Sequence, residues 1–323
     1  MTFVLYGISA LQHWLAIHAG QPIRACSHHP NLPTRGIRAN EAEAILGAFP
    51  YLSHPLHVLA GKPVKDSRPS LVLHHTWTAL LPSRTFVRLT TNAYASTPEL
   101  AFVQATKSLT LVDAIRLGFE LCGTYSLDPT SPGGFRQRPP LTTPRRMNAC
   151  LEQMAGAHGV KKARRAVRYL LPHSASPAET NLAMALTLPY TLGGYGLGGA
   201  ELNGIVGASP RGRAVSGKDH LRCDLLWRDK LVGAEYDSDR EHTGSERIAR
   251  DSHRRNSLMH LGITSVTFTR MQFNSLDECD RTARTLAKYL GKRIQPRCPD
   301  FRRCQIDLRR CLRSDPPWMP RRR

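Results

Sequence analysis

The sequence predicts an α/β protein, in which a mixed α+β N-terminal region precedes a core with the order helix, strand, strand, strand, helix, strand, helix. Three observations predict this core. Ser-led capping boxes open helices after Ser176 and Ser275. Two strand-like segments within residues 222–237 are joined by a short polar turn. A β-branched run at 263–269 follows Gly262, a residue type that commonly ends helices.

The charge of the chain favours a polyanionic partner. Its 323 residues include 45 Lys and Arg against 25 Asp and Glu, which gives a formal net charge of +20 and a pI of about 10.2. The phosphate backbone of DNA is the commonest polyanion that such an excess attracts. A general Arg-rich bias of the source's proteins would give the same balance, so charge alone does not assign a function.

The cysteines and the apolar segments indicate the cellular compartment in which we expect the protein. The eight cysteines are scattered without any Cys-x-x-Cys pair, a pattern that suits reduced thiols in a cytoplasm better than a zinc site. The apolar N-terminus lacks the basic leader of a signal peptide. No apolar run approaches the ~18 residues of a membrane span. We therefore expect a cytoplasmic protein without a membrane partner.

We expect four regions along the chain. Residues 1–128 form a mixed α/β region, a candidate DNA-recognition or regulatory module. Residues 129–172 form a linker rich in Pro, Gly, Ser and Thr, followed by a basic helix. Residues 173–292 form the core. Residues 293–323 form a basic tail rich in Pro and Arg, which we expect to be disordered or only partly ordered.

The basic helix is a candidate nucleic-acid contact. Its cations recur at positions i, i+3, i+4 and i+7, so they share one side of the helix: Lys161, Arg164, Arg165 and Arg168. A stripe of this kind suits contacts to phosphates. The alternative is a solvated helix surface, and the place of the stripe just before the core favours the phosphate contact slightly.

Simple register arithmetic places two acids of the core. If Asp229 and Lys230 are the two residues of the turn, the numbers of paired residues sum to 459, and Asp224 lies across from Glu235. Two carboxylates that close repel each other unless a cation lies between them or one is protonated. A three-residue turn would shift the register and separate them. On the second strand, Glu235 and Asp237 project to the same side.

Five segments of the chain, taken in order, resemble one known family. They are SPAET (176–180), CDLLW (223–227), EYDSDREH (235–242), DSHRR (251–255) and GITSVTFT (262–269). Together they resemble the PD-(D/E)xK restriction-endonuclease-like superfamily, in the branch grouped with very-short-patch-repair endonucleases. The resemblance covers roughly the 115 residues of the core and implies a restriction-endonuclease-like αβββαβα domain. The N-terminal region has a weaker similarity to abortive-infection type IV antitoxin-like proteins.

The resemblance implies a role for each acid. Glu179, Asp224 and Glu235 would be the acidic residues around a Mg²⁺ or Mn²⁺ ion, and Asp237 the second acid of the third strand. The metal ligands would be Asp224, Glu235 and Asp237. The superfamily's Lys is replaced by Asp237, as is usual for this branch. Glu179 also has a sufficient structural explanation, because it is the last residue of a Ser-Pro-Ala-Glu capping box.

Three further residues are implied only by the resemblance. His242 matches a nearby histidine that would act as general acid or base. Asp251 and Arg255 match a pair on the following helix, where Arg255 would hold a phosphate or brace the site. Ser238 stands where the branch has glycine, so the loop that carries His242 differs from the family's pattern.

Two functions follow from these observations. The first is a Mg²⁺-dependent DNA endonuclease or nickase. The second is a DNA-binding regulator of antitoxin type, whose nuclease-like domain no longer cuts. DNA is the expected partner in both. The sequence leaves open whether a homodimer forms and which DNA is recognised.

Overall fold

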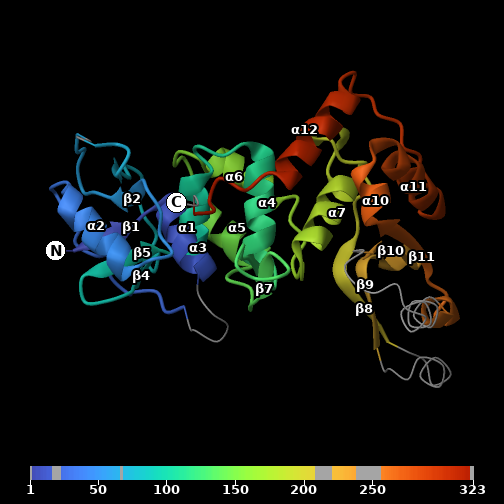
Figure 1. Ribbon diagram of the computed structural model, residues 1–323, viewed down its shortest axis with the longest axis horizontal. Coiled ribbons are helices and arrows are strands. Elements are labelled where there is room, and N and C mark those ends of the chain that lie inside the picture. The colour runs from blue at the N-terminus through green and yellow to red at the C-terminus, as the bar shows by residue number, and fades with distance from the viewer. Residues whose placement is uncertain (1, 17–22, 66–67, 208–219, 238–255, 321–323) are drawn as a thin grey trace. The chain divides into compact units, whose positions relative to one another are not determined.

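The computed structural model describes residues 2–16, 23–65, 68–207, 220–237 and 256–320. The fold is mixed α/β, as the sequence predicts. The chain divides into two compact units (Figure 1). The first comprises residues 1–170 and 313–323, and the second comprises residues 171–312. Each unit has a sheet of its own, so each is described separately.

The first unit is built on a five-stranded mixed sheet with the order β3-β2-β1-β5-β4. Its strands are β1 (Phe3–Leu5), β2 (Leu56–Leu59), β3 (Val72–His75), β4 (Phe86–Arg88) and β5 (Ala93–Ser96). Strand β1 is parallel to β5 and antiparallel to β2. Helix α1 (Gly7–Ala16) packs beside α3 (Pro98–Ala105), and α2 (Ala39–Ala48) lies between β1 and β2 in the chain.

The segment expected to link two regions belongs instead to this first unit. It contributes β7 (Phe135–Gln137), which pairs with β6 (Tyr125–Leu127), and the helices α5 (Pro144–Gln153) and α6 (Val160–Val167). Both helices pack with α3, and α6 also packs on α4 (Leu111–Cys122). The Pro and Thr residues that suggested a linker form a helix start, because Thr143 caps α5 with Pro144 in its first turn.

The second unit contains a four-stranded sheet with the order β11-β10-β9-β8. Its strands are β8 (Glu201–Gly207), β9 (His220–Trp227), β10 (Val232–Asp237) and β11 (Thr264–Thr269). The first three form an antiparallel meander, and β11 is parallel to β10. The helices of the unit are α7 (Pro177–Thr187), α10 (Arg270–Asn274), α11 (Leu276–Tyr289) and α12 (Phe301–Arg313), with short 3-10 turns η1 (Tyr190–Leu192) and η2 (Arg228–Lys230).

The helix ends in this unit follow the signals in the sequence. The Ser176 hydroxyl accepts from Glu179 N at the start of α7, and the Ser275 hydroxyl accepts from Glu278 N at the start of α11. Residues 256–260 are helical, and Gly262 ends that helix with a φ of +72°. Ile263 N then bonds Leu258 O, which closes a Schellman motif. Helix α7 contacts β9 and β10, so it covers the middle of the sheet (Figure 1).

The expectation of a disordered tail is wrong for residues 301–313, which form α12. Leu308 and Leu312 are buried one turn apart, and Arg302 binds Asp277 and Asp280 of α11. The tail looked disordered because its charge and proline content are high. The prolines lie outside the helix, however, and the arginines alternate with a narrow apolar stripe that packs. Farther on, Trp318 is fully buried in the first unit.

Among the described helices, none is both long enough and apolar enough to cross a lipid bilayer.

Candidate active site

The hairpin of β9 and β10 has the register that the arithmetic predicts. Trp227 pairs with Val232 and Leu225 pairs with Ala234. Leu231 N bonds Arg228 O at 3.2 Å, so Asp229 and Lys230 are the central residues of the turn. The next position along both strands brings Asp224 level with Glu235. There the Asp224 carboxylate bonds the other strand directly, because its Oδ2 accepts from Tyr236 N at 2.8 Å.

The side chains of β9 do not alternate strictly between the two sides of the sheet. Leu221, Cys223 and Leu226 pack in one cluster with Leu258 and Ile263. Strict alternation would place Leu226 opposite the other two. On β8, the residue level with Asp224 is Asn203, whose φ of +52° is in the left-handed region. The sheet is therefore locally distorted at the candidate aspartate, a feature that often accompanies functional sites.

Glu179 is held in place by a dense set of hydrogen bonds. It lies in the first turn of α7 and is only 9% exposed. Its Oε2 accepts from Ala175 N and from Asn203 Nδ2, each at 2.7 Å, while the Ser176 hydroxyl donates to Oε1 at 3.1 Å. The Ser176 half of the predicted capping box is confirmed, whereas the Glu179 carboxylate accepts from Ala175 N, one residue before the N-cap. This structural role of Glu179 does not exclude a second role.

Glu179 and Asp224 are close enough to interact electrostatically. Burial raises the pKa of Glu179, and the charge of Asp224 raises it further, while the bonds from Ala175 and Asn203 act in the opposite direction. The structure therefore brings together an acid from α7 and an acid from β9, beside the backbone of β10. Two acids placed in this way favour either a shared proton or a bound cation.

Asn203 is a site residue that the sequence analysis missed. Its Nδ2 donates to His173 O at 2.6 Å as well as to Glu179, which fixes the orientation of the side-chain amide. Its Oδ1 is buried and has no hydrogen-bond partner in the described part of the chain. The signal that marks this residue is the Asn-Gly pair inside an expected strand, since Asn-Gly tolerates a positive φ and is more typical of turns.

The three expected metal ligands do not form a metal cage. Glu235 and Asp237 lie on β10 level with Thr267 and Thr269 of β11, and both are half-buried. Within the described residues, no group of three or more His, Cys, Asp or Glu side chains is arranged to hold a metal ion. Asp224 Oδ2 is bonded to Tyr236 N. His242, Asp251 and Arg255 lie outside the described residues.

The basic stripe of α6 divides into contacting and exposed cations. Lys161, Arg165 and Arg168 are exposed, as a surface for phosphate contacts requires. Arg164 is half-buried, and its Nη2 donates to Leu151 O at 3.2 Å, so it also holds α5 and α6 together. Periodicity placed all four on one side of the helix but could not show which of them braces the fold.

No protein-family model, curated protein or solved structure matches this chain.

Proposed function

We propose that this chain is a metal-dependent DNA endonuclease or nickase, which hydrolyses phosphodiester bonds at the acids of α7, β9 and β10. The observation that carries the proposal is geometric: Asn203 of β8 lies level with Asp224 of β9, and its Nδ2 bonds Glu179 Oε2 of α7 at 2.7 Å. Half-buried or buried carboxylates that lie close together are costly unless a cation or a proton compensates their charge.

The oxygen atoms of the site suit Mg²⁺ or Mn²⁺. Mg²⁺ prefers oxygen ligands and is commonly held by one or two carboxylates together with waters and substrate phosphates, so a closed protein cage is not required. Asp224 would supply a carboxylate, with Glu235 as its neighbour on β10. Asn203 Oδ1 is a buried amide oxygen with no partner among the described residues, which makes it a further candidate ligand. When bound, such an ion lowers the pKa of water and stabilises charge on the phosphate.

The remaining assignments rest on the resemblance of the sequence. Asp237 would complete the acidic set on β10, His242 would act as general acid or base, and Asp251 and Arg255 would support the site. Lys161, Arg165 and Arg168 would contact the phosphate backbone without reading sequence, because contacts to phosphates fix position and carry no base information.

The test is cleavage of supercoiled plasmid by purified protein in Mg²⁺ or Mn²⁺. We expect Asp224→Asn and Glu235→Gln each to lower the rate by about 100-fold, because each replaces a carboxylate that would hold the metal ion with a neutral amide. Glu201→Gln is the matched control, because Glu201 is an exposed acid of the same sheet that pairs with Arg228. Its rate should equal that of the wild type, and thermal melting confirms that all variants fold.

Equal activity in all four proteins would assign the cleavage to a contaminant and reject the proposal.

The second function is a DNA-binding regulator of antitoxin type. It is supported by the formal net charge of +20, which favours binding to DNA with or without cleavage. Gel-shift assays in EDTA separate the two functions. Tight binding to the protein's own promoter, together with no cleavage of any substrate in Mg²⁺ or Mn²⁺, would select the regulator.

A further inference from the structure

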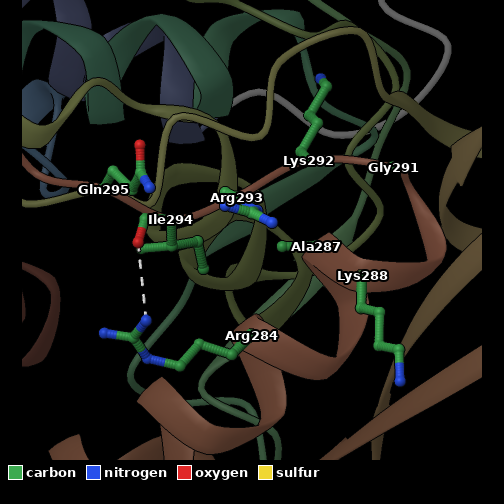
Figure 2. Close-up of a pocket in the computed structure, with 8 residues that line it drawn as sticks. All are labelled: Arg284, Ala287, Lys288, Gly291, Lys292, Arg293, Ile294 and Gln295. Atoms are coloured by element: carbon green, nitrogen blue, oxygen red, sulfur yellow. Dashed lines mark hydrogen bonds between the residues drawn. The ribbon is translucent and has the colours of Figure 1, made fainter.

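A strongly basic pocket lies in the second unit, at the end of α11. Its volume is about 540 Å³, and its walls are the last turns of α11 and residues 291–295 (Figure 2). Half of its eight lining residues are cations, and none of the eight is acidic. The four cations are Arg284, Lys288, Lys292 and Arg293.

The local sequence creates this pocket by turning the chain back along the helix. Gly291 has a φ of +66°, which reverses the chain after α11. Lys292 N bonds Ala287 O at 2.8 Å and Gly291 N bonds Lys288 O at 3.1 Å, so the turn is a closed Schellman motif. Ile294 is then buried. It fixes the returning segment beside Arg284, whose Nη1 donates to Ile294 O at 3.5 Å.

The positive charge of the pocket is not neutralised within the described part of the chain. Arg284 and Lys292 donate to backbone carbonyls, of Ile294 and Gly198, which carry no net charge. Lys288 and Arg293 are exposed, and neither forms an ion pair with any described residue. The acids of α11 lie at the other end of the helix, where Arg302 and Arg281 bind them.

A helix dipole explains only part of this arrangement. Cations near a helix C-terminus are stabilised by a partial charge of roughly −0.5, and this accounts for Lys288. Lys292 and Arg293 come after the helix, and the Schellman bonds already occupy carbonyls of its last turn. Four full positive charges also outweigh the partial negative charge, so the pocket as a whole attracts anions.

We infer that this pocket binds the phosphates of a nucleic-acid backbone. Figure 2 shows that the charged ends of Arg284, Lys288, Lys292 and Arg293 point in different directions around the pocket and do not converge on one point. Cations spread in this way suit successive phosphates of a strand, whereas a single phosphate would need converging donors. The inference goes beyond the proposed function and does not depend on cleavage, because a regulator would use the same contacts.

The test is the salt dependence of DNA binding in EDTA, measured by fluorescence anisotropy of a labelled random-sequence duplex. Each phosphate contact contributes about 0.9 to the slope of log K against log salt. We expect the double variant Lys288→Gln/Arg293→Gln to reduce the slope by about two and to weaken binding roughly tenfold near 0.15 M salt. The matched control is Lys230→Gln/Arg303→Gln, which removes two exposed cations of the same unit outside the pocket.

Three results would overturn the inference. If the pocket variant keeps the wild-type slope, the pocket does not contact the backbone. If the control loses as much slope as the pocket variant, only net charge matters. In a separate arm, inorganic phosphate is added during thermal melting. If it stabilises the wild type but not the pocket variant, while the slopes for DNA are equal, the pocket takes free phosphate. If the wild type cleaves no DNA but the pocket variant still loses slope, the result counts against the proposed function alone and leaves the inference standing.

Discussion

At the scale of single residues, Asn203 shows how local strain and the candidate site coincide. Asn203 is in the left-handed region, which costs a non-glycine residue about 1–2 kcal/mol of folding free energy. Regular strand pairing does not offset this cost. Its Nδ2 compensates by bonding both His173 O and Glu179 Oε2. The same geometry leaves Oδ1 buried without a partner among the described residues. The side chain is therefore placed for binding, at a cost to folding.

Two half-buried histidines predict the response of the first unit to acid. Burial lowers the pKa of His13 and of His57 from 6.5 to about 4. Between these values the unfolded chain binds protons that the folded chain does not bind. The free energy of unfolding is therefore fully present above pH 6.5 and falls as the pH decreases toward 4.

We expect His13→Asn to reduce this loss by up to about 3 kcal/mol, because Asn does not titrate and can still bond the Tyr51 hydroxyl. Urea unfolding at a series of pH values measures the effect. His29→Asn is the control, since His29 is exposed, and its pH dependence should follow the wild type. A His13 variant as acid-sensitive as the control would contradict the assignment.

At the scale of elements, much of the second unit could be predicted from the sequence, because the ends of its helices are marked by strong local signals. Two helices begin where a serine hydroxyl caps the first turn, at Ser176 and Ser275. Another helix ends at Gly262, which adopts a positive φ. Both signals are local and do not depend on tertiary contacts. The register of β9 and β10 followed from the length of one turn. By contrast, α12 was missed because arginines that pair with acids of α11 are indistinguishable in sequence from solvated ones.

The sequence could predict the acidic residues of the candidate site but not the tertiary contacts that arrange them. Sequence patterns identified Asp224 and Glu235 as acids on adjacent strands, and the pairs observed up to Leu225 and Ala234 have the predicted register. The distortion at Asn203 could not be predicted, because it arises from tertiary hydrogen bonds to α7 and to His173. Leu221, Cys223 and Leu226 of β9 pack in one cluster, so strict alternation does not show which acids share one side of the sheet.

The turn between β9 and β10 gives a prediction at this scale. Leu231 has a φ of +52° and is 45% exposed, so its side chain contributes strain and little packing. We expect Leu231→Gly to raise the free energy of unfolding by about 1 kcal/mol, since glycine adopts this conformation without a Cβ penalty. Gly262→Ala is the opposite case, at a φ of +72°, and should lower it by a similar amount. Urea unfolding of both variants checks the pair, and equal effects would refute it.

At the scale of the whole molecule, the two ends of the sequence belong to one unit. Residues 313–323 return to the unit formed by residues 1–170. Trp318 is fully buried there, and its Nε1 donates to Glu120 Oε2 at 2.8 Å. Burial raises the pKa of Glu120, while the bonds from Leu127 and Trp318 lower it. Arg116 also donates to Ser314 O at 2.9 Å. The C-terminal segment is thus a structural part of the first unit.

This arrangement predicts that a substitution close to the C-terminus destabilises the N-terminal unit. We expect Trp318→Ala to lower the free energy of unfolding by about 3–5 kcal/mol, because it leaves a cavity and removes a donor from the buried carboxylate of Glu120. Pro317→Ala is the control, as Pro317 is exposed next to it and should change stability little. Limited proteolysis with mass spectrometry locates the effect. Faster cleavage within residues 1–170 is expected for Trp318→Ala, and equal melting of the two variants would show that the C-terminal segment contributes no stability to that unit.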